Sequence, residues 1–230
     1  MKKIGFIGAY DKTDMLLYIA KILTTMKNKV LLVDSTINQK ARYVVPAINP
    51  TMSYITSFED IDVAVGFNSV DDIKNYIGIT EELPYDIMLM DIDTPERVNN
   101  FHLDMADKSY FVTSFDIFSL RRGVEILRAV QVPINLKKIL FAKEILKEED
   151  DYLNLLALGC KVMWEEERIY FPFENGDLSV IAENQRVQKI KFKKLSVQYK
   201  DSLSFITQEI LDHDNDSSVR KAMKIIERGV

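Results

Sequence analysis

The chain has 230 residues, of which 47% are hydrophobic and 28% are charged, and this composition excludes an intrinsically disordered protein. No stretch approaches the roughly 18 consecutive apolar residues of a membrane-spanning helix, which excludes an integral helical membrane protein. The formal net charge of −5 disfavours non-specific binding to nucleic acid, because phosphate backbones attract basic surfaces. The first residues show no cleavage-site pattern of a secretory signal, so we expect a cytoplasmic protein.

Short apolar runs alternate with helical patterns along most of the chain, which is typical of βαβ units around a parallel sheet. The predicted strands are residues 3–8, 30–33, 61–65, 87–90, 110–113, 139–142 and 168–172. The predicted helices are residues 13–27, a helix from 69, 117–130, a helix from 148, 178–185 and 196–211. Pro172 lacks a backbone donor and places the last strand at a sheet edge. We therefore predict an α/β protein, a single doubly wound domain with a mostly parallel sheet and helices on both faces.

Three segments depart from this alternation. Residues 35–58 show no regular element, because Pro46 and Pro50 interrupt any pattern. Residues 212–218 are polar and form a predicted linker between the domain at 1–211 and a tail at 219–230. The tail is a basic amphipathic pattern with Val219, Ala222, Met223 and Ile226 on one helical face and Arg220, Lys221, Lys224 and Arg228 around the other.

The junction between the first strand and the first helix is the candidate phosphate site. A P-loop needs backbone N–H groups that converge on phosphate, a lysine that reaches the terminal phosphates and a Ser or Thr hydroxyl for Mg²⁺. Lys12 and Thr13 stand in the last two positions. Phe6 and Asp11 replace the two glycines of the strict motif, so the P-loop is predicted to be degenerate.

Two carboxylates are candidate magnesium groups. Asp91 ends the apolar strand at 87–90, and Asp34 ends the strand at 30–33. A P-loop protein needs a carboxylate at such a strand end to hold the water shell of Mg²⁺. The structural alternative stays open for each residue: Lys12 and Thr13 can simply open a helix, and the aspartates can be turn formers after buried strands.

In these segments the chain resembles the MinD/ParA family of P-loop ATPases. Residues 29–34 look like its second strand, 85–91 like its Walker B strand, 106–113 like its segment reading "AD…VVT", and 171–174 with 181–184 like its late segment. The resemblance implies ATP or ADP with Mg²⁺ as ligand. It places the nucleotide on Gly8, Ala9, Tyr10, Asp11, Lys12, Thr13 and Asp14, and the metal on Thr13, Asp34 and Asp91.

The departures from the family fall on positions that the family uses in catalysis. Ile7 replaces the lysine that reaches across the family's ATP-bound dimer, and Thr36 replaces an aspartate that helps the attacking water. The Asn that reads adenine is replaced near residues 142–143. Asp11 puts a carboxylate where phosphate should lie, and two such anions repel by about 1 kcal/mol even in water-like surroundings. We therefore expect weakened ATP binding and little or no hydrolysis.

Two basic segments are candidate contact surfaces. Lys189, Lys191, Lys193, Lys194 and Lys200 surround Phe192 and Tyr199, a pattern that suits DNA or anionic lipid but more often forms a solvated face. The tail resembles in placement the membrane-targeting helix of MinD. Its candidate contact residues are Val219, Arg220, Lys221, Met223, Lys224 and Ile226, and docking onto its own domain or onto a partner is the alternative.

The function that the resemblance implies is a spatial regulator that positions a larger assembly. Its partners would be a protein of that assembly, a second copy of the chain in a homodimer, and the inner face of the membrane as a peripheral contact, without nucleic acid. Two alternatives remain: an active ATPase with rearranged catalytic groups, and a scaffold that has lost nucleotide.

Overall fold

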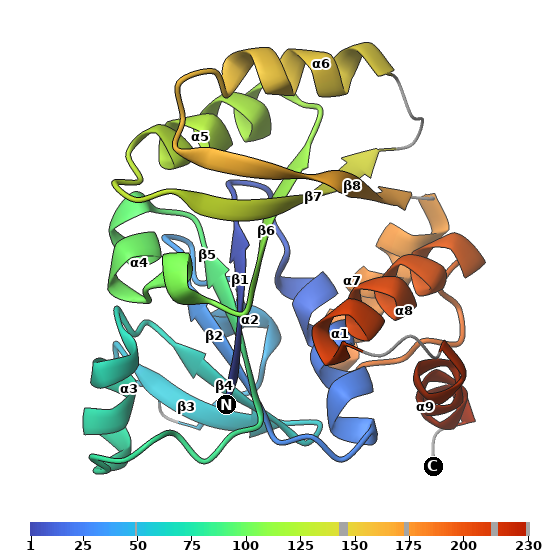
Figure 1. Ribbon diagram of the computed structural model, residues 1–230. Helices are drawn as coiled ribbons and strands as arrows, with labels where there is room; N and C mark the ends of the chain where they lie inside the picture. Colours follow the sequence, from blue (N-terminus) through green and yellow to red (C-terminus); the bar gives the residue numbers. More distant parts are fainter. Residues whose placement is uncertain (49, 143–146, 173–174, 213–215, 229–230) are drawn as a thin grey trace.

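The computed structural model describes residues 1–48, 50–142, 147–172, 175–212 and 216–228. Within these residues one eight-stranded sheet runs through the molecule in the order β3-β4-β2-β5-β1-β6-β7-β8 (Figure 1). Its strands are β1 Lys2–Ile7, β2 Val30–Ser35, β3 Tyr54–Phe58, β4 Ile61–Val65, β5 Ile87–Ile92, β6 Lys108–Ser114, β7 Ile134–Ala142 and β8 Val162–Pro172. All neighbours are parallel except β3 and β4. The predicted α/β class and mostly parallel sheet are confirmed.

Helices cover both faces of the sheet, so two apolar cores form. The helices are α1 Thr13–Thr25, α2 Ala41–Val44, α3 Val70–Ile77, α4 Pro95–Asn100, α5 Ile117–Arg128, α6 Lys147–Leu156, α7 Asn175–Val187, α8 Val197–Leu211 and α9 Asp216–Arg228, with a 3₁₀ turn η1 at Leu103–Met105. Side chains of α1, α2, α7, α8 and α9 pack on one face. Those of α3, α4, α5 and α6 pack on the other. The doubly wound arrangement follows from strands that are apolar on both faces.

Strand β1 carries Phe6 into the core, in agreement with the predicted strand at residues 3–8, so the first glycine position of the strict motif lies in a strand. Phe6 is fully buried and its ring stacks on Tyr110 of β6, with centroids 5.0 Å apart. Successive strand residues face opposite sides of a sheet, and Ile7 accordingly packs into the core on the other face. The first glycine of the strict P-loop motif is therefore missing because the strand continues through that position.

The register of the central strands brings the candidate acidic residues to one edge. Asp34 of β2 lies opposite Asp91 of β5, and Phe6 of β1 lies opposite the same aspartate on its other side. Carboxyl ends of parallel strands line the crevice in which doubly wound proteins bind ligands. The chain leaves β1 at this edge and enters α1, so the candidate P-loop lies beside both aspartates.

Gly8 is required where the chain turns out of β1. Its φ is +147°, and a Cβ on this residue would lie 2.0 Å from the backbone oxygen of Val112 in β6. No side chain can occupy that space without moving the strand. The glycine thus sets the path of the loop that follows.

The sequence pattern did not predict β3, the strand at one edge of the sheet. Residues 54–58 form a strand that pairs antiparallel with β4, within the segment that showed no pattern. At the opposite edge, β8 begins at Val162, six residues before the predicted start at Arg168, and its place at the sheet edge is confirmed. Two predictions fall on residues outside the described ranges. The position of the family's adenine-reading Asn includes residue 143, within the gap at 143–146, and the late segment includes residues 173–174.

The tail packs on the body, which is the docking alternative that the sequence left open. Helix α9 begins at Asp216, inside the predicted linker 212–218, of which residues 213–215 lie outside the described residues. Val219, Ala222 and Met223 are buried against the body, and α9 contacts α1 and α8. The apolar face proposed for a membrane is therefore part of the core. Among the described residues, no helix is long and apolar enough to cross a bilayer.

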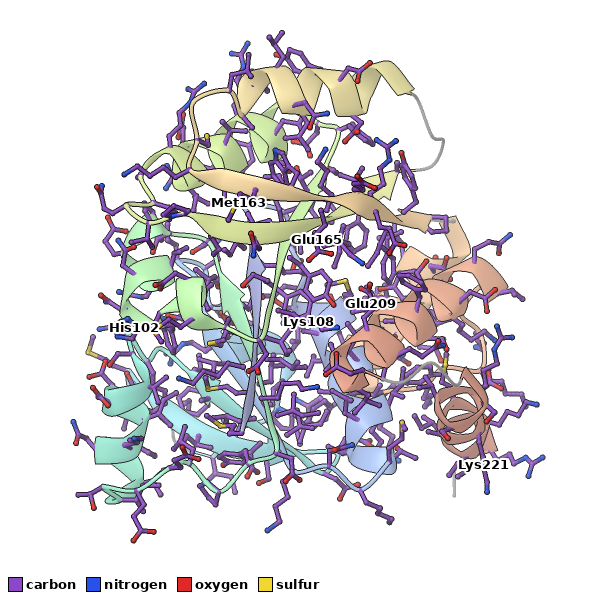
Figure 2. All side chains as sticks on the ribbon, viewed as in Figure 1. His102, Lys108, Met163, Glu165, Glu209 and Lys221 are labelled. Carbon is purple, nitrogen blue, oxygen red and sulfur yellow. The ribbon has the colours of Figure 1, made fainter. Side chains whose placement is uncertain are left out.

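We expect Val219→Ala to lower the free energy of unfolding by about 1 to 2 kcal/mol, because it removes two buried methyl groups. Lys221→Ala, on the exposed side of the same helix (Figure 2), should change it by less than about 0.5 kcal/mol. Urea denaturation measures both. Equal effects of the two substitutions would contradict the docked position of α9.

Candidate functional site

The loop between β1 and α1 lines a cavity of about 270 Å³ at the carboxyl edge of the sheet. The loop supplies Gly8, Ala9, Tyr10, Asp11, Lys12 and Thr13, and the other lining residues are Thr36, Asn38, Lys40, Tyr43, Asp91 and Asp93. Six of the seven predicted nucleotide-binding residues thus meet at one place. The seventh, Asp14, lies outside the cavity lining, where its carboxylate accepts hydrogen bonds of 2.9 Å from Gln185 of α7.

Lys12 is buried, and its ammonium group contacts two oxygens of the chain itself. Its side chain is 1% exposed, and its Nζ lies 2.7 Å from Oδ1 of Asp91. The same Nζ donates a hydrogen bond of 2.9 Å to the backbone oxygen of Gly8. The lysine predicted to reach phosphate is therefore engaged by two oxygens of the protein.

Asp91 sits at the end of β5 and is almost completely buried. Thr13 Oγ1 lies 3.5 Å from its second carboxylate oxygen. Burial raises the pKa of Asp91 to about 7, while the nearby Lys12 ammonium acts in the opposite direction. Lysine, threonine and aspartate thus come together as the sequence predicted, and they are held to one another.

Asp11 binds the start of α1 in the way a phosphate oxygen would. Its Oδ1 accepts a hydrogen bond of 3.1 Å from the backbone N–H of Thr13, the first residue of the helix. The first N–H groups of a helix have no partner within the helix and favour an anion. One of the donors of the phosphate cradle is therefore occupied by a carboxylate of the chain itself.

Lys40 lies in the segment that follows β2 and pairs with carboxylates at the start of α1. Its Nζ forms ion pairs with Asp11 and, at 2.6 Å, with Asp14. Burial opposes its protonation, but the carboxylates of Asp14 and Asp11 raise the pKa of Lys40 overall. The lysine thus remains charged and bridges two residues of the candidate P-loop.

Asp34 is enclosed by local donors. One carboxylate oxygen accepts from the hydroxyl of Thr36 at 2.6 Å and from its N–H at 3.1 Å. The other accepts from the N–H of Ala41 at 2.8 Å. Asp34 does not line the cavity. These contacts fit the turn-forming alternative, and a role in holding Mg²⁺ would have to share oxygens that already bind the backbone.

Sequence reasoning missed Lys40 and Asp93. Lys40 lies in the segment without pattern, and no local signal connects it with a loop 29 residues earlier. Asp93 follows the Walker B-like strand by two residues, accepts from the N–H of Ile37 at 2.9 Å, and has its pKa raised by burial. A search for every carboxylate near that strand end would have found Asp93.

The donors of the site fit a phosphate group, whereas its charge does not. Lys12, Thr13 and loop N–H groups are the chemistry that binds a nucleotide phosphate and its Mg²⁺. The cavity is lined by two lysines and by the three carboxylates of Asp11, Asp91 and Asp93. Within the described part of the chain, no group of three or more acidic, histidine or cysteine residues is arranged to hold a metal by itself. Mg²⁺ would need oxygens from a nucleotide.

Several solved structures superpose on most of this chain. A plasmid partition protein from Borrelia burgdorferi, bound to AMPPNP, superposes with a TM-score of 0.58 at 15% identity over 92% of this chain and 98% of that one. The chain has a MinD/ParA-like fold. MinD from Aquifex aeolicus gives a TM-score of 0.57 at 15% identity, covering 94% and 99% of the two chains. A single-residue variant of McdA from Cyanothece, in complex with ATP, gives 0.56 at 12% identity, covering 94% and 98%.

No family profile and no curated protein matches the sequence. The predicted resemblance to MinD/ParA proteins is thus confirmed for the fold. At these identities the roles of single residues rest on the geometry of this chain.

Proposed function

We propose that this protein is a MinD/ParA-like regulator that positions a larger assembly, with weakened ATP binding and little or no hydrolysis. The observation that carries the proposal is the contact of Asp11 with the Thr13 N–H and with Lys40. A phosphate that enters the loop has to displace this carboxylate and to separate Lys12 from Asp91. Each step costs part of the binding energy, so the affinity for ATP or ADP falls.

Weak hydrolysis is supported by two positions. Ile7 is fully buried in β1 and packs among apolar side chains, so nothing at that position can reach a neighbouring copy as a charge. Thr36 offers a neutral hydroxyl, which is a far weaker base toward water than the carboxylate of an aspartate. Stabilisation of charge in the transition state is the largest contribution to phosphoryl transfer, and Ile7 and Thr36 stand where MinD/ParA proteins carry two of the groups used for hydrolysis.

The positioning role is supported by the similar structures. They include a plasmid partition protein, a cell division protein and McdA, all with the same fold. Contact with a protein of the positioned assembly, a homodimer and peripheral contact with a membrane are parts of this proposal. Contact with a membrane through the apolar side of α9 would require that helix to leave the body.

The two other functions make different use of the same cavity. An active ATPase is favoured by the joint presence of Lys12, Thr13 and Asp91 in the cavity lining. A nucleotide-free scaffold is favoured by the fact that Lys12 and Asp91 already satisfy each other. Calorimetric titration with Mg-ATP and Mg-ADP separates the scaffold, which would give no heat of binding, from the other two.

Turnover then separates the proposed regulator from the ATPase. We expect release of inorganic phosphate at the background rate, unchanged by Thr13→Ala, because Ile7 and Thr36 replace groups that MinD/ParA proteins use for hydrolysis. A rate above background that Thr13→Ala abolishes would establish the ATPase and overturn the proposal. Thr24→Ala, on the same helix but outside the cavity, is the matched control.

A further inference from the structure

A second hollow of about 670 Å³ lies at the C-terminal end of α1, whereas the P-loop region lies at its N-terminal end. It is formed by the end of α1, the turn between β3 and β4, the segment between α7 and α8, and the end of α9. Its lining residues are Lys21, Thr24, Thr25, Lys27, Glu59, Asp60, Lys189, Ile190, Lys191, Phe192, Lys193, Ile225, Ile226, Glu227 and Arg228. We call it the basic groove.

The positive charge of the basic groove is mostly unneutralised. Lys21 pairs with Glu59 at 3.1 Å and with Asp60 at 3.3 Å, and Glu227 pairs with Lys200 at 2.9 Å. All three carboxylates of the lining are thus engaged. Among the described residues, no ion pair engages the remaining cations, which are Lys27, Lys189, Lys191, Lys193 and Arg228. A cluster of free cations on a chain with net charge −5 marks a site for an anionic partner.

The floor of the groove is apolar. Phe192 is fully buried and packs edge-on against Tyr18, with ring centroids 5.0 Å apart. Ile190 and Ile226 are partly buried against the core, and Ile225 is 38% exposed. A ligand that fills the groove therefore meets apolar side chains below and ammonium groups at the rim.

Shape and charge favour a peptide over a membrane or nucleic acid. A bilayer presents a flat surface, while the free cations here line a concavity, and the apolar face of α9 is buried. Phe192 and Tyr199, the two aromatic residues of the predicted basic segment, are both buried in the core and cannot stack on bases.

We propose that the basic groove binds a short acidic segment of a protein partner, with an apolar side chain of that segment seated on Ile190, Ile225 and Ile226. Acidic side chains along the segment pair with the free lysines, and the apolar side chain covers the exposed isoleucine surface. The inference rests on the groove alone, and it stands whether or not the P-loop region binds ATP.

The test uses the full chain and a fluorescein-labelled peptide, Glu-Asp-Leu-Glu-Glu-Leu-Asp-Glu, followed by fluorescence anisotropy. We expect saturable binding that Lys191→Glu with Lys193→Glu weakens about tenfold, because each reversal removes an attraction and adds a repulsion. The matched control, Lys221→Glu with Lys224→Glu, makes the same change of charge on α9 outside the groove and should weaken binding less than about twofold. A peptide with serine in place of both leucines should bind more weakly than the parent peptide.

Three results would overturn the proposal. The first is no saturable binding of the peptide by the unmodified protein. The second is an equal loss of affinity in the groove variant and the control variant, when thermal unfolding shows both to be folded. The third is that vesicles of phosphatidylglycerol and phosphatidylcholine, or a labelled DNA duplex, bind more tightly than the peptide and lose that binding in the groove variant.

Discussion

Replacing Lys12 with methionine is expected to lower the free energy of unfolding by about 3 to 5 kcal/mol at pH 8, because it leaves the buried carboxylate of Asp91 without its partner. The contact joins two side chains that are 1% and 2% exposed, so the carboxylate is far from fully hydrated once the ammonium group is gone. Chemical denaturation at several pH values measures the loss. A loss below about 1 kcal/mol at pH 8 would contradict a structural role for this pair.

The pH dependence of this loss has a definite sign. The folded-state pKa of Asp91 is raised to about 7 by burial, and removal of Lys12 takes away the charge that lowers it. A group with a raised pKa contributes stability that is present below its unfolded-state value of about 4 and is lost as the pH rises through the folded value. Lys12→Met should therefore be better tolerated at pH 5 than at pH 8. The double variant Lys12→Met with Asp91→Asn should recover part of the stability at pH 8, since no buried charge remains.

Replacing Asp11 with glycine is expected to tighten binding of Mg-ATP by about 2 to 3 kcal/mol, which is about 30-fold to 160-fold. The substitution removes a negative charge beside the incoming phosphates and frees the Thr13 N–H. It also releases Lys40 from one of its two ion pairs, so a second cation becomes available at the cavity. Titration with a fluorescent ATP analogue measures the change.

Lys40 supplies the control for this prediction. In the double variant Asp11→Gly with Lys40→Gln, the affinity for Mg-ATP still gains from the removal of the carboxylate. It no longer gains from a lysine freed at the cavity. We expect affinity between those of the unmodified protein and Asp11→Gly. An affinity of Asp11→Gly equal to that of the unmodified protein would show that the carboxylate is no obstacle to nucleotide.

The sequence predicted those parts of the structure that depend on local pattern. Alternating apolar runs and helical spacing were enough for the sheet, and the position of Asp91 after an apolar strand was enough to place it beside Lys12. The strict motif puts its first glycine at Phe6, inside the predicted strand, and the burial of the ring and its stacking on Tyr110 place this residue in the core. At this position, packing against other strands decides where the strand ends and the loop begins.

The pairing of the site residues with one another could not be predicted from local pattern. The contacts of Lys40 with Asp11 and Asp14 join parts of the chain that only the fold brings together. The docking of α9 has the same origin, because an amphipathic helix shows which face is apolar and does not show what that face covers. The sequence presents Asp11 as an unfavourable negative charge in the loop. In the fold, the ammonium group of Lys40 compensates that charge.

Asp11 occupies the anion site at the start of α1, and the Thr13 amide reports on that site directly. In ¹⁵N-edited NMR spectra, titration with inorganic pyrophosphate should shift the Thr13 amide resonance in Asp11→Gly at concentrations that leave it unshifted in the unmodified protein. The same shift at the same concentrations in both proteins would contradict the account, because the carboxylate would then leave the donor open to phosphate.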